Sequence, residues 1–252
     1  MKKIIGIVGG IGPYAGLDLN KKVFDNIKTF GKDQDYLDVH LVSRPSAIGD
    51  RTAFLEGKEK INPAFGIFRS ILLLERLGAN LIALPCNTAH SPKIYNKIEE
   101  LLEASSSKLE LLHIVKECHK YLEQNFKKGD KIGLLATKGT YNSNLYKDIF
   151  DKNGIFTLIH PQKEGQNASH DAIYSLEYGV KAKPNITQKA KDIFENEISE
   201  FEKDGVSAVI LGCTEIPLAF EGRNKFNNIA LIDASDILAR ALVEKVDKKY
   251  LK

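Results

Sequence analysis

The chain contains an internal repeat, and each copy ends in a cysteine. Cys86 and Cys213 both follow a short apolar run that is itself preceded by a charged stretch ending in glycine. The interval between the two cysteines also separates Gly6 from Gly133, which lie in two other apolar runs (213 − 86 and 133 − 6 are both 127). A repeat of this kind predicts two similar lobes in which the two cysteines occupy equivalent positions.

Short apolar runs bounded by glycine, asparagine or proline alternate with amphipathic stretches along the whole chain, which predicts β-α units and parallel sheets. Strands are expected at Ile4–Val8, Val39–Val42, Leu81–Leu84, Leu109–Leu112, Ile132–Leu135, Phe156–Ile159, Ala208–Leu211 and Ile229–Ile232. Helices are expected at Ala15–Lys28, Ala64–Leu77, Lys93–Leu102, Val115–Gln124, Asn144–Lys152, Ala168–Tyr178, Gln188–Lys203 and Ser235–Val246. The predicted fold class is α/β, with two pseudo-symmetric lobes that are each a parallel sheet flanked by helices, and with the active site in the cleft between them.

The serine run at 105–107 marks the expected crossing from the first lobe to the second. Because the repeat places Ile229–Ile232 beyond the second cysteine, we expect the chain to return to the first lobe before that strand. The predicted first lobe is therefore residues 1–104 and 218–252, and the predicted second lobe is residues 105–217.

Composition excludes several classes of function. A net charge of +3 with scattered lysines does not favour nucleic acid as a partner. The apolar runs are too short or too interrupted to span a bilayer, so no membrane association is expected. Three cysteines in 252 residues do not form a disulfide framework, which favours a reducing cytoplasm.

Two of the cysteines are candidates for chemistry. Cys86 follows a predicted strand directly and precedes a helix that begins near Pro92, where the helix dipole favours a thiolate; Cys213 has a matching context. In doubly wound folds ligands bind at the carboxyl ends of the strands, where both cysteines lie. Cys118, in contrast, is expected to be a small buried hydrophobe on a helix. A disulfide between Cys86 and Cys213 is less favoured because it would suit an exported protein better. A zinc site that adds His90 is less favoured because no clear fourth metal ligand is present.

Two turns are candidates for carboxylate binding. The turn around Gly10 and Ile11 lacks the spacing of a dinucleotide loop, so its glycines either let backbone amides approach a small carboxylate or only form a tight turn. Thr137 and Thr140 follow the equivalent strand in the repeat, at a helix start where anions bind. An N-cap role for Thr140 or Asn142 is the structural alternative.

Basic side chains offer further candidates. Arg51 is expected in a loop, and its guanidinium is well shaped to bind a carboxylate through two hydrogen bonds, although a solvated arginine is the alternative. Lys181 or Lys183 could supply a second cation. His90 could orient a neighbour or be a buried core histidine.

Two segments closely resemble the paired signature motifs of the aspartate/glutamate racemase family, most of all its aspartate racemase branch. They are Leu84–His90 (Leu-Pro-Cys-Asn-Thr-Ala-His) and Leu211–Pro217 (Leu-Gly-Cys-Thr-Glu-Ile-Pro). Further similarity occurs in the same order at Gly9–Pro13, Asp50–Thr52 and Leu135–Thr140, so the resemblance spans nearly the whole chain.

The resemblance implies a cytoplasmic homodimer that needs no cofactor and acts on a small dicarboxylic amino acid. It implies that one cysteine of the pair is a thiolate and the other a thiol, which remove and return the α-proton on opposite faces of the substrate. Carried over by motif, the proton-transfer residues are Cys86 and Cys213. The substrate-binding residues are Gly10, Ile11, Arg51, Asn87, Thr88, Thr137, Thr140, Lys181 and Thr214.

Three alternatives remain open. A maleate isomerase or a hydantoin racemase of the same superfamily would use the same cysteine pair on another substrate. A non-catalytic protein that binds an acidic metabolite would keep the cleft and lose the reaction.

Overall fold

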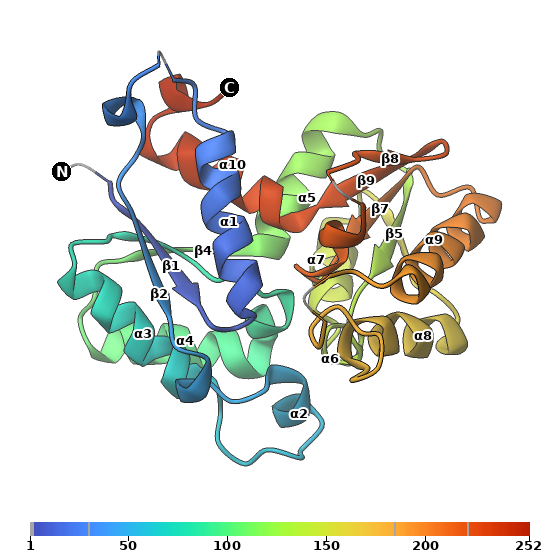
Figure 1. The fold of residues 1–252 in the computed structure, drawn as a ribbon, viewed down its shortest axis with the longest axis horizontal. Helices are drawn as coiled ribbons and strands as arrows, with labels where there is room; N and C mark the ends of the chain where they lie inside the picture. Colours follow the sequence, from blue (N-terminus) through green and yellow to red (C-terminus); the bar gives the residue numbers. More distant parts are fainter. Residues whose placement is uncertain (1–2, 30, 184, 221) are drawn as a thin grey trace. The chain divides into compact units, whose positions relative to one another are not determined.

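The computed structural model of the protein describes residues 3–29, 31–183, 185–220 and 222–252. The chain forms two compact units, shown as one ribbon in Figure 1. The first unit comprises Met1–Glu117 and Ser235–Lys252, and the second comprises Cys118–Ala234. The division between them falls inside α5 (Ile114–Asn125).

The first unit contains a four-stranded sheet in the order β2-β1-β3-β4, in which all described pairs are parallel. Its strands are β1 (Ile5–Gly9), β2 (Val39–Ser43), β3 (Leu81–Ala83) and β4 (Glu110–Leu112). Its helices are α1 (Pro13–Asp25), α2 (Arg51–Leu55), α3 (Ala64–Arg76), α4 (Pro92–Ala104) and nearly all of α10 (Ala234–Val246). Both α1 and α3 contact β1, and α3 also packs against α4, so helices cover the sheet (Figure 1).

The second unit contains a five-stranded sheet in the order β6-β5-β7-β9-β8. Its strands are β5 (Lys131–Leu135), β6 (Thr157–Ile159), β7 (Ala208–Leu211), β8 (Lys225–Phe226) and β9 (Ile229–Asp233), of which only β8 pairs in the antiparallel direction. Its helices are α6 (Lys138–Asn142), α7 (Leu145–Asn153), α8 (Lys163–Tyr174) and α9 (Gln188–Lys203). The predicted α/β fold class, with parallel sheets flanked by helices, is confirmed.

The internal repeat is visible in the strand register. Gly6 of β1 pairs with Ile82 of β3, and Gly133 of β5 pairs with Val209 of β7, so the interval of the repeat is kept in both members of the pair. The orders β2-β1-β3-β4 and β6-β5-β7-β9 are also the same. The strands that precede the two cysteines, β3 and β7, are therefore topologically equivalent.

The predicted points of crossing between lobes need correction. Residues 110–112 form β4 and pair with β3, so the segment after residue 104 still belongs to the first sheet. Residues 229–233 form β9 and pair with β7, so this strand belongs to the second sheet and is the counterpart of β4. The strand itself was predicted, but the repeat did not place it in the second sheet, because the 3-10 turn Ile216–Phe220 and the short β8 precede it where a full helix, α4, precedes β4.

The predicted strands and helices are all present, and most of them have shifted ends. The largest shift is at α8, which ends at Tyr174 because the Ser175 backbone leaves the helical region. Pro13 and Pro92 are the first residues of α1 and α4, and Ser91 is the N-cap residue of α4, although its side chain makes no capping hydrogen bond. The short elements α2, α6 and β8 were not predicted.

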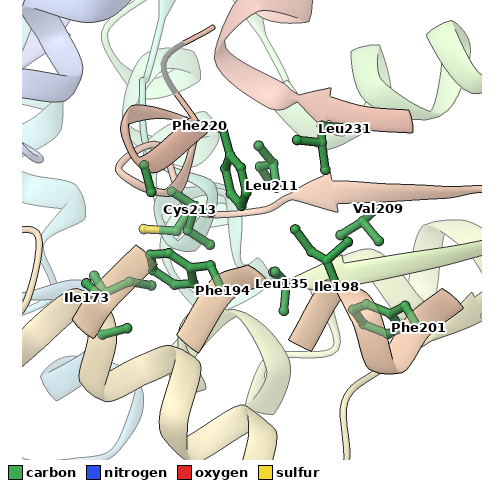
Figure 2. Packing of buried hydrophobic residues seen from close by; sticks show 14 of the residues in the cluster. Leu135, Ile173, Phe194, Ile198, Phe201, Val209, Leu211, Cys213, Phe220 and Leu231 are labelled. Carbon is green, nitrogen blue, oxygen red and sulfur yellow. The ribbon is translucent and has the colours of Figure 1, made fainter. Parts of the chain in front are cut away.

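The core of the second unit extends to the catalytic candidate Cys213. Phe194, Ile198 and Phe201 of α9 lie on one stripe at helical spacing and pack against β5 and β7. Figure 2 shows Cys213 at the end of this cluster opposite Phe201, with its sulfur beyond the aromatic ring of Phe194. The backbone at Cys213 is therefore held by a rigid apolar support.

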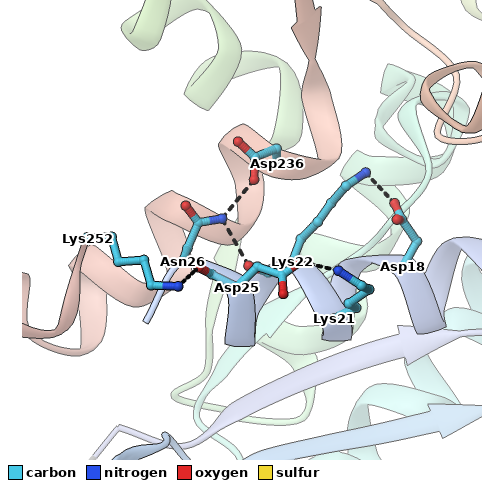
Figure 3. Close-up of polar contacts among 7 residues, drawn as sticks. All are labelled: Asp18, Lys21, Lys22, Asp25, Asn26, Asp236 and Lys252. Carbon is cyan, nitrogen blue, oxygen red and sulfur yellow. Dashed lines mark hydrogen bonds and ion pairs between the residues drawn. The ribbon is translucent and has the colours of Figure 1, made fainter. Parts of the chain in front are cut away.

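A polar network ties α10 to α1 in the first unit (Figure 3). The amide nitrogen of Asn26 donates to Asp236 Oδ1 at 2.7 Å and to the Lys22 carbonyl at 2.9 Å. Its oxygen accepts from Arg240 Nη1 at 3.0 Å. The Lys252 backbone N–H also donates to the Asn26 carbonyl at 3.0 Å, so the end of the chain is attached at the same place.

Candidate active site

Cys86 lies where β3 ends and the chain turns into a 3-10 turn, Asn87–His90. The Cys86 backbone is extended, and its carbonyl accepts from the Ala89 N–H at 3.2 Å. Cys86 is 9% exposed, and Asn87 and Thr88 beside it are buried. The turn therefore presents a thiol, an amide and a hydroxyl from consecutive positions at the carboxyl end of a central strand.

His90 fastens this turn to the end of the neighbouring strand. Its Nδ1 lies 2.9 Å from the Cys86 carbonyl oxygen, and its Nε2 lies 3.4 Å from the Leu112 carbonyl oxygen. The shorter contact fits a neutral ring whose Nδ1–H donates to Cys86. Burial lowers the pKa of His90 to about 4, although both carbonyls oppose the change. His90 is thus both a buried histidine and an orienting one.

A second histidine, His113, packs against His90. The ring centroids are 4.7 Å apart, and Tyr95 lies against both rings. Burial, together with His90 and Lys116, lowers the pKa of His113 to about 2. Within the described residues, His113 Nδ1 is buried without a hydrogen-bond partner. No sequence signal had singled out this residue.

Arg51 lies on a helix, which corrects the predicted loop. Asp50 is the N-cap of α2 and accepts from the Ala53 N–H at 2.7 Å, so Arg51 is the first helical residue. Its Nη1 donates to the Gly49 carbonyl at 3.1 Å, and the side chain is largely buried. The helix α2 that carries Arg51 contacts the turn Asn87–His90, which follows Cys86.

The turn between β1 and α1 brings the chain close to β2. Gly10 has a φ of +83°, and a Cβ at this position would lie 2.7 Å from the Arg44 backbone nitrogen. Only glycine fits this conformation and this approach without strain. The Ile11 side chain is buried in the core of the first unit, so only its backbone is available to a ligand.

Cys213 follows β7 in the equivalent place. Gly212 precedes it and donates its N–H to the Leu135 carbonyl at 2.7 Å. The Cys213 thiol donates to Glu215 Oε2 at 2.9 Å. Burial and the Glu215 carboxylate raise the pKa of Cys213 well above its usual value, and Lys181 opposes them. The surroundings of Cys213 therefore favour the thiol form, because its nearest charged neighbour is an anion.

Lys181 lies beside Cys213 and Glu215, with its ammonium paired to Glu215 Oε1. Burial lowers the pKa of Lys181, but Glu215, Cys213 and Tyr174 outweigh that effect and raise it. The Thr214 hydroxyl also donates to Glu215 Oε2, at 3.3 Å. The structure thus brings together the predicted residues Lys181, Cys213 and Thr214 around Glu215, a residue to which sequence reasoning assigned no role.

Thr137 and Thr140 lie together at the start of α6, after β5. Thr137 is the N-cap residue and accepts from the Thr140 N–H, so the capping role predicted for Thr140 or Asn142 belongs to Thr137. The two hydroxyl oxygens are 3.3 Å apart and both side chains are buried. Thr137 is oriented by the same hydrogen bond that caps the helix.

The other sequence expectations for the site have simple outcomes. Cys118 is fully buried on α5, as predicted, and all three cysteines are free thiols. Among the residues that the structure describes, no group of three His, Cys, Asp or Glu side chains is placed to hold a metal ion. In the same part of the chain, none of the helices is long and apolar enough to cross a membrane.

The fold and the site define an α/β protein with a repeated unit and a free cysteine at the end of each equivalent strand. Residues 8–242 match the family described as Asp/Glu/Hydantoin racemase, and the chain belongs to that family. The resemblance expected from the two cysteine motifs is thereby confirmed, as is the expectation of an enzyme of the racemase class at the level of the family.

Similar proteins agree with this assignment. The chain is 29% identical over 244 residues to the broad specificity amino-acid racemase RacX of Bacillus subtilis, with 95% of this chain and 96% of RacX covered. The solved structure of Picrophilus torridus aspartate racemase matches with a TM-score of 0.81 at 28% identity, over 99% of this chain and 96% of that one. An aspartate racemase homologue from Pyrococcus horikoshii OT3 has the same fold, with a TM-score of 0.70 at 24% identity and 98% and 99% coverage.

Proposed function

We propose that the protein interconverts the L and D forms of a small acidic amino acid, aspartate or glutamate, by proton transfer between Cys86 and Cys213 without a cofactor. The observation that carries the proposal is the strand equivalence. The strands β3 and β7 keep the interval of the repeat in their pairing, and each is followed by a free cysteine at its carboxyl end.

A racemase needs two groups that act on opposite faces of one α-carbon. In the proposed step, the Cys86 thiolate removes the α-hydrogen as a proton and leaves the C–H electron pair in an enediolate. That pair then takes the proton of the Cys213 thiol, whose sulfur becomes a thiolate. The reverse reaction begins from the opposite charge states, as expected for two nearby thiols that cannot both ionise easily.

The enediolate must be stabilised because a thiol of ordinary pKa, about 8.5, is a weak base for an α-hydrogen. Amide and hydroxyl groups aimed at the substrate α-carboxylate can supply this stabilisation. Asn87, Thr88 and Thr214 lie within two residues of the two cysteines in the sequence and are buried, which supports this role.

The acidic substrate is supported by the buried guanidinium of Arg51 and by the hydroxyls of Thr137 and Thr140 at a helix start. We assign the backbone at Gly10 and Ile11 to the same purpose. Similarity to an aspartate racemase favours aspartate, whereas similarity to RacX favours a wider range of amino acids.

Replacing either Cys86 or Cys213 by serine tests the proposal. Each change substitutes a hydroxyl of much higher pKa for the thiol and should lower kcat by about 10²- to 10⁴-fold. Cys118→Ser is the matched control, because Cys118 is buried on α5 and takes no part in the proposed reaction. The measurement is chiral chromatography of the products from L- and D-aspartate, from the two glutamate enantiomers and from a panel of neutral amino acids.

Full turnover by either active-site variant would contradict the two-base scheme. Turnover of maleate or a hydantoin without racemisation of any amino acid would reassign the substrate. Tight binding of acidic amino acids without α-proton exchange would instead indicate a binding protein.

We further propose that the protein works as a homodimer in the cytoplasm, where a reducing environment keeps free thiols active.

A further inference from the structure

The carboxylate of Glu215 is the centre of a buried polar cluster in the second unit. Its Oε2 accepts from the Cys213 thiol at 2.9 Å and from the Thr214 hydroxyl at 3.3 Å, and its Oε1 is paired with the Lys181 ammonium. Glu215 itself is only 5% exposed. Every polar group in this cluster faces the same carboxylate.

The arrangement determines where the proton of Cys213 lies. With an anionic Glu215, a thiolate at Cys213 would place two negative charges 2.9 Å apart in a buried setting. A thiol in the same place donates a hydrogen bond instead. The lysine partner explains why Glu215 keeps its charge, because a buried carboxylate without a cation would itself become protonated.

We propose that Glu215 is a positioning residue that keeps Cys213 protonated in the ligand-free protein. The inference rests on the proposed function, in which Cys213 exchanges a proton with substrate. It makes Cys213 the proton donor of the resting protein and leaves Cys86 as the base. An enantiomer whose α-hydrogen faces Cys86 reacts from this form directly, and its mirror image reacts only after the proton has moved between the two sulfurs.

The same cluster assigns a role to Lys181. Its ammonium is paired with Glu215. When Cys213 gives up its proton, Lys181 is the positive charge that stabilises the new thiolate. Glu215 and Lys181 therefore act on Cys213 in opposite directions.

The test is a pH titration of the Cys213 thiol in the whole chain labelled with ¹³C at the cysteine β-carbons. The protein has three cysteines, so three signals are assigned from the single serine variants. Glu215→Gln removes the anion and should lower the midpoint of the Cys213 titration by about 1 to 3 pH units. Glu215→Asp keeps the anion but withdraws it from the sulfur by one methylene group, and should lower that midpoint by a smaller amount.

Glu195→Gln is the matched control, because it breaks another ion pair of the same unit, the one with Arg223, and should leave the Cys213 midpoint in place. A Cys213 midpoint that stays unchanged or rises in Glu215→Gln would overturn the inference. If Glu215→Gln does not fold, an unchanged or higher Cys213 midpoint in Glu215→Asp overturns the inference.

The titration uses no substrate, so it separates this inference from the proposed function. If the wild-type protein racemises no amino acid but the Glu215 variants show the expected lower midpoint, the proposed function is refuted and the role of Glu215 stands. If the wild-type protein racemises aspartate but the variants show no such change, only the role of Glu215 is refuted.

Discussion

Replacing His90 by asparagine should make the stability of the protein less sensitive to acid. The asparagine amide can still donate to the Cys86 carbonyl, but it cannot take up a proton. In the wild-type protein, burial lowers the pKa of His90 from 6.5 to about 4. An unfolded chain therefore binds a proton at this residue at a higher pH than the folded protein does.

The sign and size of the effect follow from this difference. Because the folded pKa is the lower one, the stabilisation is complete above pH 6.5 and is lost as the pH falls towards 4. Between pH 7 and pH 5, the wild-type protein should lose about 2 kcal/mol of unfolding free energy through His90 alone. His113, whose pKa is also lowered by burial, adds to the loss in both proteins and cancels in the comparison.

Urea unfolding followed by circular dichroism measures the effect. The difference in unfolding free energy between pH 7 and pH 5 should be about 2 kcal/mol smaller in His90→Asn than in the wild-type protein. Between pH 7 and pH 8 the two proteins should change in parallel, which serves as the control. Equal losses in both proteins between pH 7 and pH 5 would refute the assignment of a buried, neutral His90.

Two further substitutions test the supports of the two cysteine-bearing units. In Gly212→Ala, the new Cβ would lie 2.5 Å from Leu134 Cδ1 and 3.0 Å from the Leu135 carbonyl oxygen. Calorimetry should therefore show a loss of about 1 to 3 kcal/mol in unfolding free energy, and the racemisation rate should fall as Cys213 shifts. Unchanged stability and rate would show that the contact is easily relieved. Asn26→Ala removes the side chain that joins Asp236 and Arg240. Urea unfolding of the first unit should show a loss of about 1 to 3 kcal/mol in unfolding free energy, with no change in kcat for the folded fraction. A stability equal to that of the wild-type protein would contradict the structural role of this network.

Long elements could be predicted from the sequence because they carry a strong periodic signal. Phe194, Ile198 and Phe201 repeat at helical spacing, and the bounds of α9 agree with the prediction at both ends. The short α2 and α6 have too few residues for such a signal. Their starts depend on single capping side chains, Asp50 and Thr137, whose roles are clear only once the backbone is known.

The chemistry of the site was predictable only in part. The repeat identified Cys86 and Cys213 because equal spacing survives in the sequence itself. The protonation of Cys213 depends on the Glu215 carboxylate, two residues away, which the turn brings to hydrogen-bond distance. Likewise, His90 and His113 meet because the pairing of β3 with β4 brings the ends of these two strands together. Contacts of this kind have no periodic signature.

The origin of the hydrogen in the product tests the central claim most directly. L-aspartate is incubated with the protein in heavy water, and the α-hydrogen content of both enantiomers is measured by mass spectrometry at low conversion. Two cysteines acting on opposite faces predict that the D-aspartate formed carries deuterium from the solvent, while the remaining L-aspartate still carries protium. D-aspartate that keeps the original α-hydrogen would contradict the account, because a single base would then have moved the proton from one face to the other.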